Sequence, residues 1–309
     1  MRKEVEMPGV RRFLDRSVAR AGAVFAVAGL LGSAAPPPVT AETIVQRFAP
    51  GEQPPSGTQL APPVSAITQR TNLPSSFYVI PWFTVDLDDP GATTTLFAIR
   101  NEQEADNEVT VEYYDPSFGS LGDEFVVLGG MQVLTRNVRD AGLAESGVVS
   151  GFIRILADAP VTVDTFQITP SEAFASGGVP VDVSGGGLCT SWRSRFLLGG
   201  GFSGGTVLTL LFNQPLGPGE PSLRGTAYNE AGNEINTFSI TTDEFAIQVP
   251  ASDLVLPGNP FGSLTLEFLA PEEEGAIVNT GAVQANYDAL GLFSVAIEGH
   301  CLDEVGPIL

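Results

Sequence analysis

The chain has 309 residues, of which 36 are acidic and 15 basic, so its formal net charge at pH 7 is −21. A field this negative repels nucleic acid and anionic lipid surfaces, so we expect neither as a partner. The 35 glycines and 24 prolines recur between short runs of β-branched and aromatic residues, which is typical of an all-β protein with many turns.

Residues 1–41 have the pattern of a signal peptide. They hold six of the 15 basic residues, followed by an apolar run over 21–31 that is too short to cross a bilayer. The small residues at 39–41 fit a cleavage site better than those at 32–34. We therefore expect a protein that is secreted, periplasmic or on the cell surface, with no membrane span in its mature chain. Residues 11–14 are similar to part of a twin-arginine signal, which leaves the general and twin-arginine export routes open.

Removal of this leader makes the chain more acidic. The mature chain keeps nine arginines, no lysine and 33 carboxylates, a net charge of about −24. Solubility is the simplest interpretation of this charge, and a surface that binds divalent cations is the alternative. Partners should be neutral, cationic or bridged by a metal ion.

The composition divides the mature chain into four segments. Residues 42–74 are rich in proline and are predicted to be an extended or disordered linker. Residues 75–170 form the first predicted domain, a Gly/Ser-rich linker covers 171–187, and the second domain covers 188–304. Each domain is long enough for its own core.

Strand patterns are dense in the first domain. The clearest covers 109–114, where Val109, Val111 and Tyr113 alternate with Thr110, Glu112 and Tyr114. Pro81 is expected to end the first strand or to keep it at an edge, and one helical turn is predicted near 140–146. The predicted strands are 77–80, 94–100, 109–114, 124–128, 132–137, 151–156 and 161–168.

The pattern then restarts, which suggests an internal duplication. Residues 208–213 align with 96–101, and 261–268 align with 150–157, at an offset of 111 to 112 residues. Chance similarity of two β-rich segments is the alternative. Either way, two β-sandwiches are predicted.

The turn and strand over 107–115 resemble the Ig-like modules of secreted bacterial surface proteins, in which an Asn-rich turn leads into an alternating strand that ends in Tyr-Asp or Tyr-Asn. The resemblance covers 77–170 and, more loosely, 206–298. It implies two tandem Ig-like antiparallel β-sandwich domains. It also implies a structural or adhesive role, with a protein or carbohydrate partner at a cell surface.

The two cysteines, Cys189 and Cys301, stand at the two ends of the second domain. Outside the cytoplasm we expect them to form a disulfide. The single histidine, His300, adjoins Cys301, which makes it a poor member of a Ser-His-Asp triad, and one histidine cannot form a multi-histidine zinc site. We predict no catalytic residue.

Two groups are candidates for ligand binding. Asp86, Asp88 and Asp89 share a turn that could hold calcium, although solvated turn residues are the simpler interpretation. Trp82 and Tyr114 could form an aromatic platform for a sugar ring, although core packing is the simpler one. No other cofactor is expected.

Three functions follow from these patterns. The first is a secreted, acidic, non-enzymatic structural or adhesive protein. The second is a carbohydrate-binding or calcium-assisted recognition module. The third is a hydrolase that works through carboxylates, which are too numerous to dismiss.

Overall fold

The computed structural model describes residues 43–50, 52, 74–170, 174–178, 180–183, 188–198, 205–217, 219–270, 281–289, 293–298, 300 and 301. The predicted signal peptide and most of the predicted Pro-rich linker lie outside the described residues. Residues 41–309 form one compact unit.

The all-β prediction is confirmed. Strands make up most of the described residues, and the named helical elements among them are α1 (Ala251–Leu254) and the 3₁₀ turn η1 (Val138–Ala141). η1 overlaps the helical turn predicted near 140–146, and α1 was not anticipated. The described strand pairs are antiparallel, with β8 and β17 as the exception.

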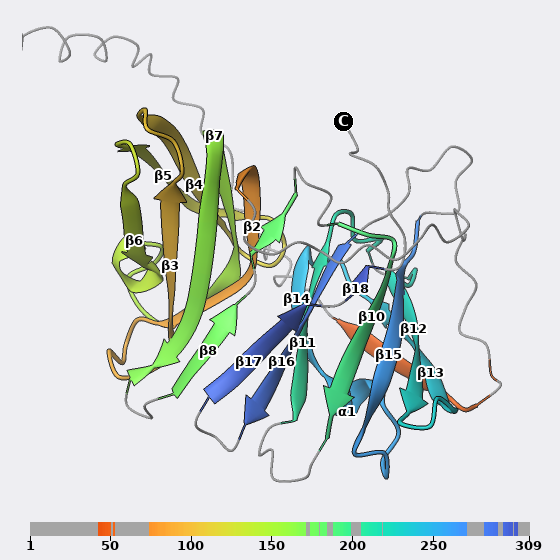
Figure 1. Cartoon of the computed structure of the whole chain (residues 1–309). Helices are drawn as coiled ribbons and strands as arrows, with labels where there is room; N and C mark the ends of the chain where they lie inside the picture. Colours follow the sequence, from red (N-terminus) through yellow and green to blue (C-terminus); the bar gives the residue numbers. More distant parts are fainter. Residues whose placement is uncertain are drawn as a thin grey trace, which may run out of the picture. The chain divides into compact units, whose positions relative to one another are not determined.

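Two sheets form the first lobe, which comprises residues 75–183. One sheet has the order β5-β4-β7-β2-β9 and the other β6-β3-β7-β8, so β7 belongs to both. Figure 1 shows β7 as a long green strand beside β3 and β4. The strands are β2 (Ser75–Asp86), β3 (Thr94–Asn101), β4 (Asn107–Tyr114), β5 (Ser120–Leu128), β6 (Val133–Asn137), β7 (Val148–Thr169), β8 (Phe174–Gly178) and β9 (Val181–Asp182).

β7 corrects one prediction. We expect two strands, at 151–156 and 161–168, but one strand spans both. Its first half pairs with β2 and β4, and its second half pairs with β3 and β8. Between the halves, Asn107 Nδ2 donates to the Ala159 carbonyl (2.9 Å) and Asn107 Oδ1 accepts from the Ala159 N–H (3.0 Å). This amide satisfies the backbone just before Pro160, so the chain passes from one sheet to the other without a turn.

Pro81 does not end its strand, which was one of the two alternatives predicted for it. β2 continues through it, pairing with β7 along one edge and with β9 at Tyr78 and Val79 along the other. The register with β7 shifts between Ile80 and Phe83. Pro81 therefore lies where the regular ladder is interrupted, a place in which its missing N–H is tolerated.

The alternation predicted for 109–114 is confirmed. Val109, Val111 and Tyr113 are buried between the two sheets, and Glu112 and Tyr114 lie half-buried on the outer face. The Tyr113 ring meets Phe83 edge-on, with 6.3 Å between ring centroids. Burial, reinforced by Glu124, raises the pKa of Tyr113 to about 12, so this phenol stays neutral in the core.

The second lobe repeats the pairing order of the first. Its sheets run β13-β12-β15-β10-β18 and β14-β11-β16-β17, with β1 added outside β13. The strands are β1 (Ile44–Phe48), β10 (Ser191–Leu197), β11 (Thr206–Phe212), β12 (Leu223–Asn229), β13 (Glu234–Thr241), β14 (Ala246–Pro250), β15 (Phe261–Phe268), β16 (Gly281–Ala289), β17 (Phe293–Glu298) and β18 (His300–Cys301). The five strands from β2 to β6 therefore correspond, in order, to those from β10 to β14. The two halves of β7 correspond to β15 and β16, and β8 and β9 correspond to β17 and β18.

Local details recur as well. Asp115 Oδ1 accepts from the backbone N–H groups two and four residues later, and Asn229 Oδ1 does the same in the second lobe. A register shift follows Tyr113 in one lobe and Ala227 in the other. The two lobes therefore share a detailed local structure as well as a strand order.

The strand order differs from the Ig order in one respect. An Ig sandwich keeps its first two strands in one sheet, whereas β2 and β3 pair here with different halves of β7, the strand that passes from one layer to the other. The feature in common is an antiparallel two-sheet architecture.

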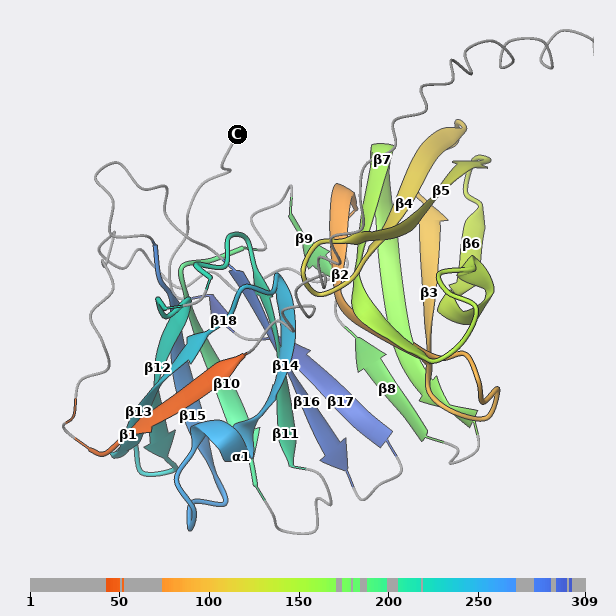
Figure 2. The ribbon, with the colours of Figure 1, turned by 180° about the vertical axis from the view of Figure 1, so that it is seen from behind.

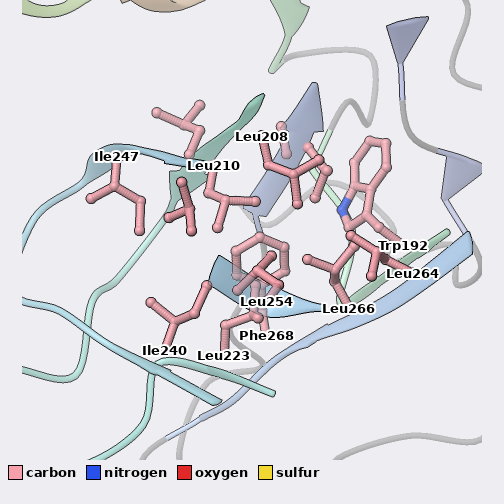
Figure 3. Packing of buried hydrophobic residues seen from close by; sticks show 14 of the residues in the cluster. Trp192, Leu208, Leu210, Leu223, Ile240, Ile247, Leu254, Leu264, Leu266 and Phe268 are labelled. Atoms are coloured by element: carbon pink, nitrogen blue, oxygen red, sulfur yellow. The ribbon is translucent and has the colours of Figure 1, made fainter. Parts of the chain in front are cut away.

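Trp192 is the largest fully buried side chain of the second core. Its Nε1 donates to the Gly281 carbonyl (2.8 Å), which satisfies the indole within an apolar site. Leu208 and Leu210 come from one sheet, and Leu264 and Leu266 come from the other. Figure 3 shows these side chains packed around Phe268.

Two segments predicted as linkers contain strands. Within 42–74, β1 pairs with β13 over five positions, from Ile44↔Thr241 to Phe48↔Thr237. Figure 2 shows this orange strand beside β13. Within 171–187, β8 pairs with β7, and β9 pairs with β2. Local composition suggests coil in both places, but each segment meets an unpaired sheet edge that satisfies its backbone.

Candidate interaction surface

Two of the three carboxylates of the predicted calcium turn, those of Asp86 and Asp89, accept hydrogen bonds within the turn. Asp86 Oδ1 accepts from the backbone N–H groups of Asp88 (3.0 Å) and Asp89 (3.3 Å), and Asp89 Oδ1 accepts from Gly91 (2.8 Å). In the part of the chain that the structure describes, no group of three or more His, Cys, Asp or Glu side chains gathers in a way that could hold a metal ion. These contacts are the ordinary hydrogen bonds of an Asx turn.

The predicted aromatic platform has a different arrangement. The Tyr114 ring stacks on Phe118 and Phe152, with 4.5 and 5.4 Å between centroids. Trp82 is half-buried against the second core, and no ring contact among the described aromatics joins it to Tyr114. Tyr114 thus belongs to a packed intramolecular cluster.

Arg154 lies at the centre of that cluster. Its guanidinium carbon is 5.4 to 5.8 Å from the ring centroids of Phe77, Tyr114 and Phe118, a distance at which cation–π attraction operates. Arg154 Nε lies 3.5 Å from Glu112 Oε2, and the Tyr114 hydroxyl donates to the same oxygen (3.2 Å). Burial and then the Glu112 charge raise the pKa of Tyr114. The charges of Arg154 and Glu112, in the middle of the outer face, therefore neutralise each other.

Phe118 occupies a backbone conformation that favours glycine. Its φ is +70°, and the corresponding residue of the second lobe, Gly232, has φ +79°. A phenylalanine is strained at such a position, so its packing must compensate. The ring contacts Phe245 of the second lobe (4.9 Å between centroids), and the Phe245 N–H donates to the Pro116 carbonyl (2.6 Å). The β4–β5 turn is thus held by the second lobe.

Glu244 stands next to this contact, and its charge should cost stability. Burial, followed by the nearby Asp243, raises its pKa above the ordinary 4.5, against a weaker opposing hydrogen bond from Thr43. A raised carboxyl pKa means that the folded state binds the proton more tightly, so the stability contributed by the neutral form is lost as pH rises from about 4.5 through the raised value.

We therefore expect Glu244→Gln to raise the thermal midpoint at pH 7. The gain in the free energy of unfolding should be below about 1 kcal/mol, because the site is partly solvated. The difference from wild type should vanish near pH 4. Thermal melts of both proteins from pH 3.5 to 8 test this. Glu230→Gln, in an exposed turn, is the matched control; a gain for Glu244→Gln that grows on acidification would contradict the expectation.

The outer face of β5 is apolar and uncovered. Phe125 is 59% exposed and Val127 is 50% exposed. Phe125 opens a row of neighbours across the sheet that continues through Thr110, Leu156 and Phe77. At the far end of this face, Val79 and Phe152 are buried within the second core. One continuous face is therefore covered by the second lobe at β2 and β7 and open at β5.

β5 also has a free backbone edge. In the described part of the chain it pairs with β4 alone. A long edge with exposed apolar side chains is a site at which another strand can add. The sequence predicts a strand at 124–128 but assigns it no functional role. The run Phe125 to Leu128 is apolar on both faces, which was the available signal, but which face is solvated depends on tertiary packing.

The cysteines are placed by backbone pairing. Cys301 in β18 stands opposite Trp192, three residues after the buried Cys189. None of the described cysteines is a free thiol. The side chains of His300 and Cys301 lie outside the described atoms, so the pairing of Cys189 with Cys301 stays a prediction.

No protein-family model and no curated protein matches the chain. A solved structure of oxalate decarboxylase is 8% identical, covers 79% of this chain and 82% of its own, and has a TM-score of 0.22. A protein from Parabacteroides distasonis is 10% identical, with 78% and 98% covered and a TM-score of 0.16. These scores are too low to carry an argument. No described helix is both long and apolar enough to cross a membrane.

Proposed function

We propose that the chain is an exported, non-enzymatic protein that acts by binding another macromolecule outside the cytoplasm. Its two lobes would be diverged copies of one sandwich, related in architecture to the Ig-like modules of surface proteins. The repeated pairing order and the repeated Asx turn support the duplication. The cationic, apolar leader supports export.

One observation carries the binding role: the apolar outer face of β5, with Phe125 and Val127 about half exposed. Exposing such side chains together costs solubility, and contiguous patches of this kind mark interaction sites. The first lobe already buries the other end of this face against the second lobe, so the face is able to form a protein interface. No observation on the described residues favours the calcium, sugar or hydrolase alternatives.

Binding to the surface of producing cells tests the proposal. Labelled mature chain should bind saturably to cells that lack their own copy, and Phe125→Asp should weaken binding at least tenfold while leaving the circular dichroism unchanged. Phe166→Asp is the matched control, because Phe166 is 49% exposed but lies on the second half of β7. Equal binding by the Phe125 and Phe166 variants would refute this role.

A further inference from the structure

The two lobes differ at one sheet edge. Among the described strands, every strand of the first lobe has a counterpart in the second, and β1 alone has none. β1 adds antiparallel to β13, and β13 corresponds to β5. The edge that is covered in the second lobe is therefore the edge that is open in the first.

The side chains on the two edges differ accordingly. The β4–β5 and β12–β13 hairpins have matching registers at an offset of 114 residues, so Phe125 corresponds to Ser239 and Val127 to Thr241. Ser239 is only 2% exposed and stands opposite Gln46 of β1. The open edge has thus acquired large apolar side chains where the covered edge has small polar ones. An edge that needed protection would carry charges or proline there instead.

We propose that the edge of β5 receives an extended segment of a partner protein, added antiparallel as β1 adds to β13. This inference rests on the proposed binding function and names the kind of partner. The segment would place apolar side chains beside Phe125 and Val127 and hydrogen-bond its backbone to the free edge of β5.

The charges near the edge of β5 indicate which further side chains the partner segment should carry. Asp123 and Glu108 are exposed beside Phe125 and Val127, and Glu104 and Asp106 are exposed in the loop next to the β5–β6 turn. The nearby cations are already in ion pairs, Arg154 with Glu112 and Arg136 with Glu124. A segment that places apolar residues opposite Phe125 and Val127, and a Lys or Arg on the same face opposite Asp123, therefore fits the edge. β1 itself carries Arg47 two residues after Val45, on the same face of the strand.

A second copy of this chain fits less well. Pairing of β5 with β5 would bring two acidic surfaces together. Donation of β1 to another copy would vacate the β13 edge in the donor, so no backbone pairing would be gained overall. The occupant is therefore a strand from a different protein.

The test uses the mature chain and a fluorescent seven-residue peptide with valine at positions 2 and 4, arginine at position 6 and threonine elsewhere, so that valine and arginine share one face of the strand. Binding is followed by fluorescence anisotropy. We expect saturable binding that weakens as salt rises, and amide hydrogen exchange in β5 that slows on binding. Phe125→Asp should weaken binding at least tenfold, and Phe166→Asp should not. The same peptide with glutamate for arginine should not bind.

Equal binding of the acidic peptide, equal loss in both variants, or unchanged exchange in β5 would overturn the inference. So would a dimer of the peptide-free chain, seen by sedimentation and lost in Phe125→Asp, because the edge would then serve self-association. If binding to cells depended on Phe125 but the peptide did not bind, the proposal of a basic strand as the partner would be refuted and the proposed function would stand.

Discussion

Trp192→Ala is expected to destabilise the second lobe by about 3–5 kcal/mol, a large part of the stability of a typical domain. The indole is fully buried, so its removal leaves a cavity lined by residues such as Leu264 and Leu266. The variant also loses the hydrogen bond from Nε1 to the Gly281 carbonyl. Urea unfolding followed by circular dichroism measures the loss.

Two further variants separate packing from hydrogen bonding. Trp192→Phe keeps most of the ring and loses the donor, so we expect an intermediate loss of about 1–2 kcal/mol. Phe261→Ala, at a side chain that is 42% exposed, should cost much less. A loss below about 1 kcal/mol for Trp192→Ala would mean that this core tolerates the cavity and would contradict the described packing.

Loss of the predicted disulfide is the second large effect. A bridge between Cys189 and Cys301 closes a loop of about 112 residues, and the entropy model gives roughly 4–5 kcal/mol for such a loop. Each single Cys→Ala variant should lose this amount, and the double variant should lose no more, because either change removes the same bond. Reduction of the wild-type protein should reproduce the loss and leave the double variant unchanged.

Thiol labelling decides the same question independently. The unfolded, unreduced protein should contain no reactive thiol. Two labelled cysteines, or additive losses in the single variants, would show that the cysteines do not pair. The backbone pairing of β18 with β10 would then have to persist without a covalent link.

Local patterns predicted the strands well where one face is core. The alternation at 109–114 needed no tertiary information, because burial of Val111 and Tyr113 follows from their shared face. β7 could not be predicted as one strand, because Pro160 normally interrupts pairing and the compensating Asn107 is 52 residues from its partner Ala159 in sequence. β1 was missed for the same kind of reason: its partner is an edge that composition does not reveal.

The candidate surface was harder to anticipate than the fold. Sequence pointed to Trp82, Tyr114 and the aspartates at 86–89 because their chemistry suggests ligands. The structure uses these groups in packing and turn formation. The sequence alone does not distinguish Phe125 from a core aromatic residue, and its exposure on the open edge of β5 appears only in the structure.

The placement of β1 also sets the order in which the chain can complete its fold. Thr43 and Thr242, which flank the pairing of β1 with β13, are hydrogen-bonded although 199 residues apart. A ribosome releases β1 first, yet its pairing site emerges only after the entire first lobe. Such distant contacts form slowly, because a long loop must close before they repay its entropy. The first lobe can therefore fold while the second is incomplete, and docking of β1 should be among the last steps of maturation.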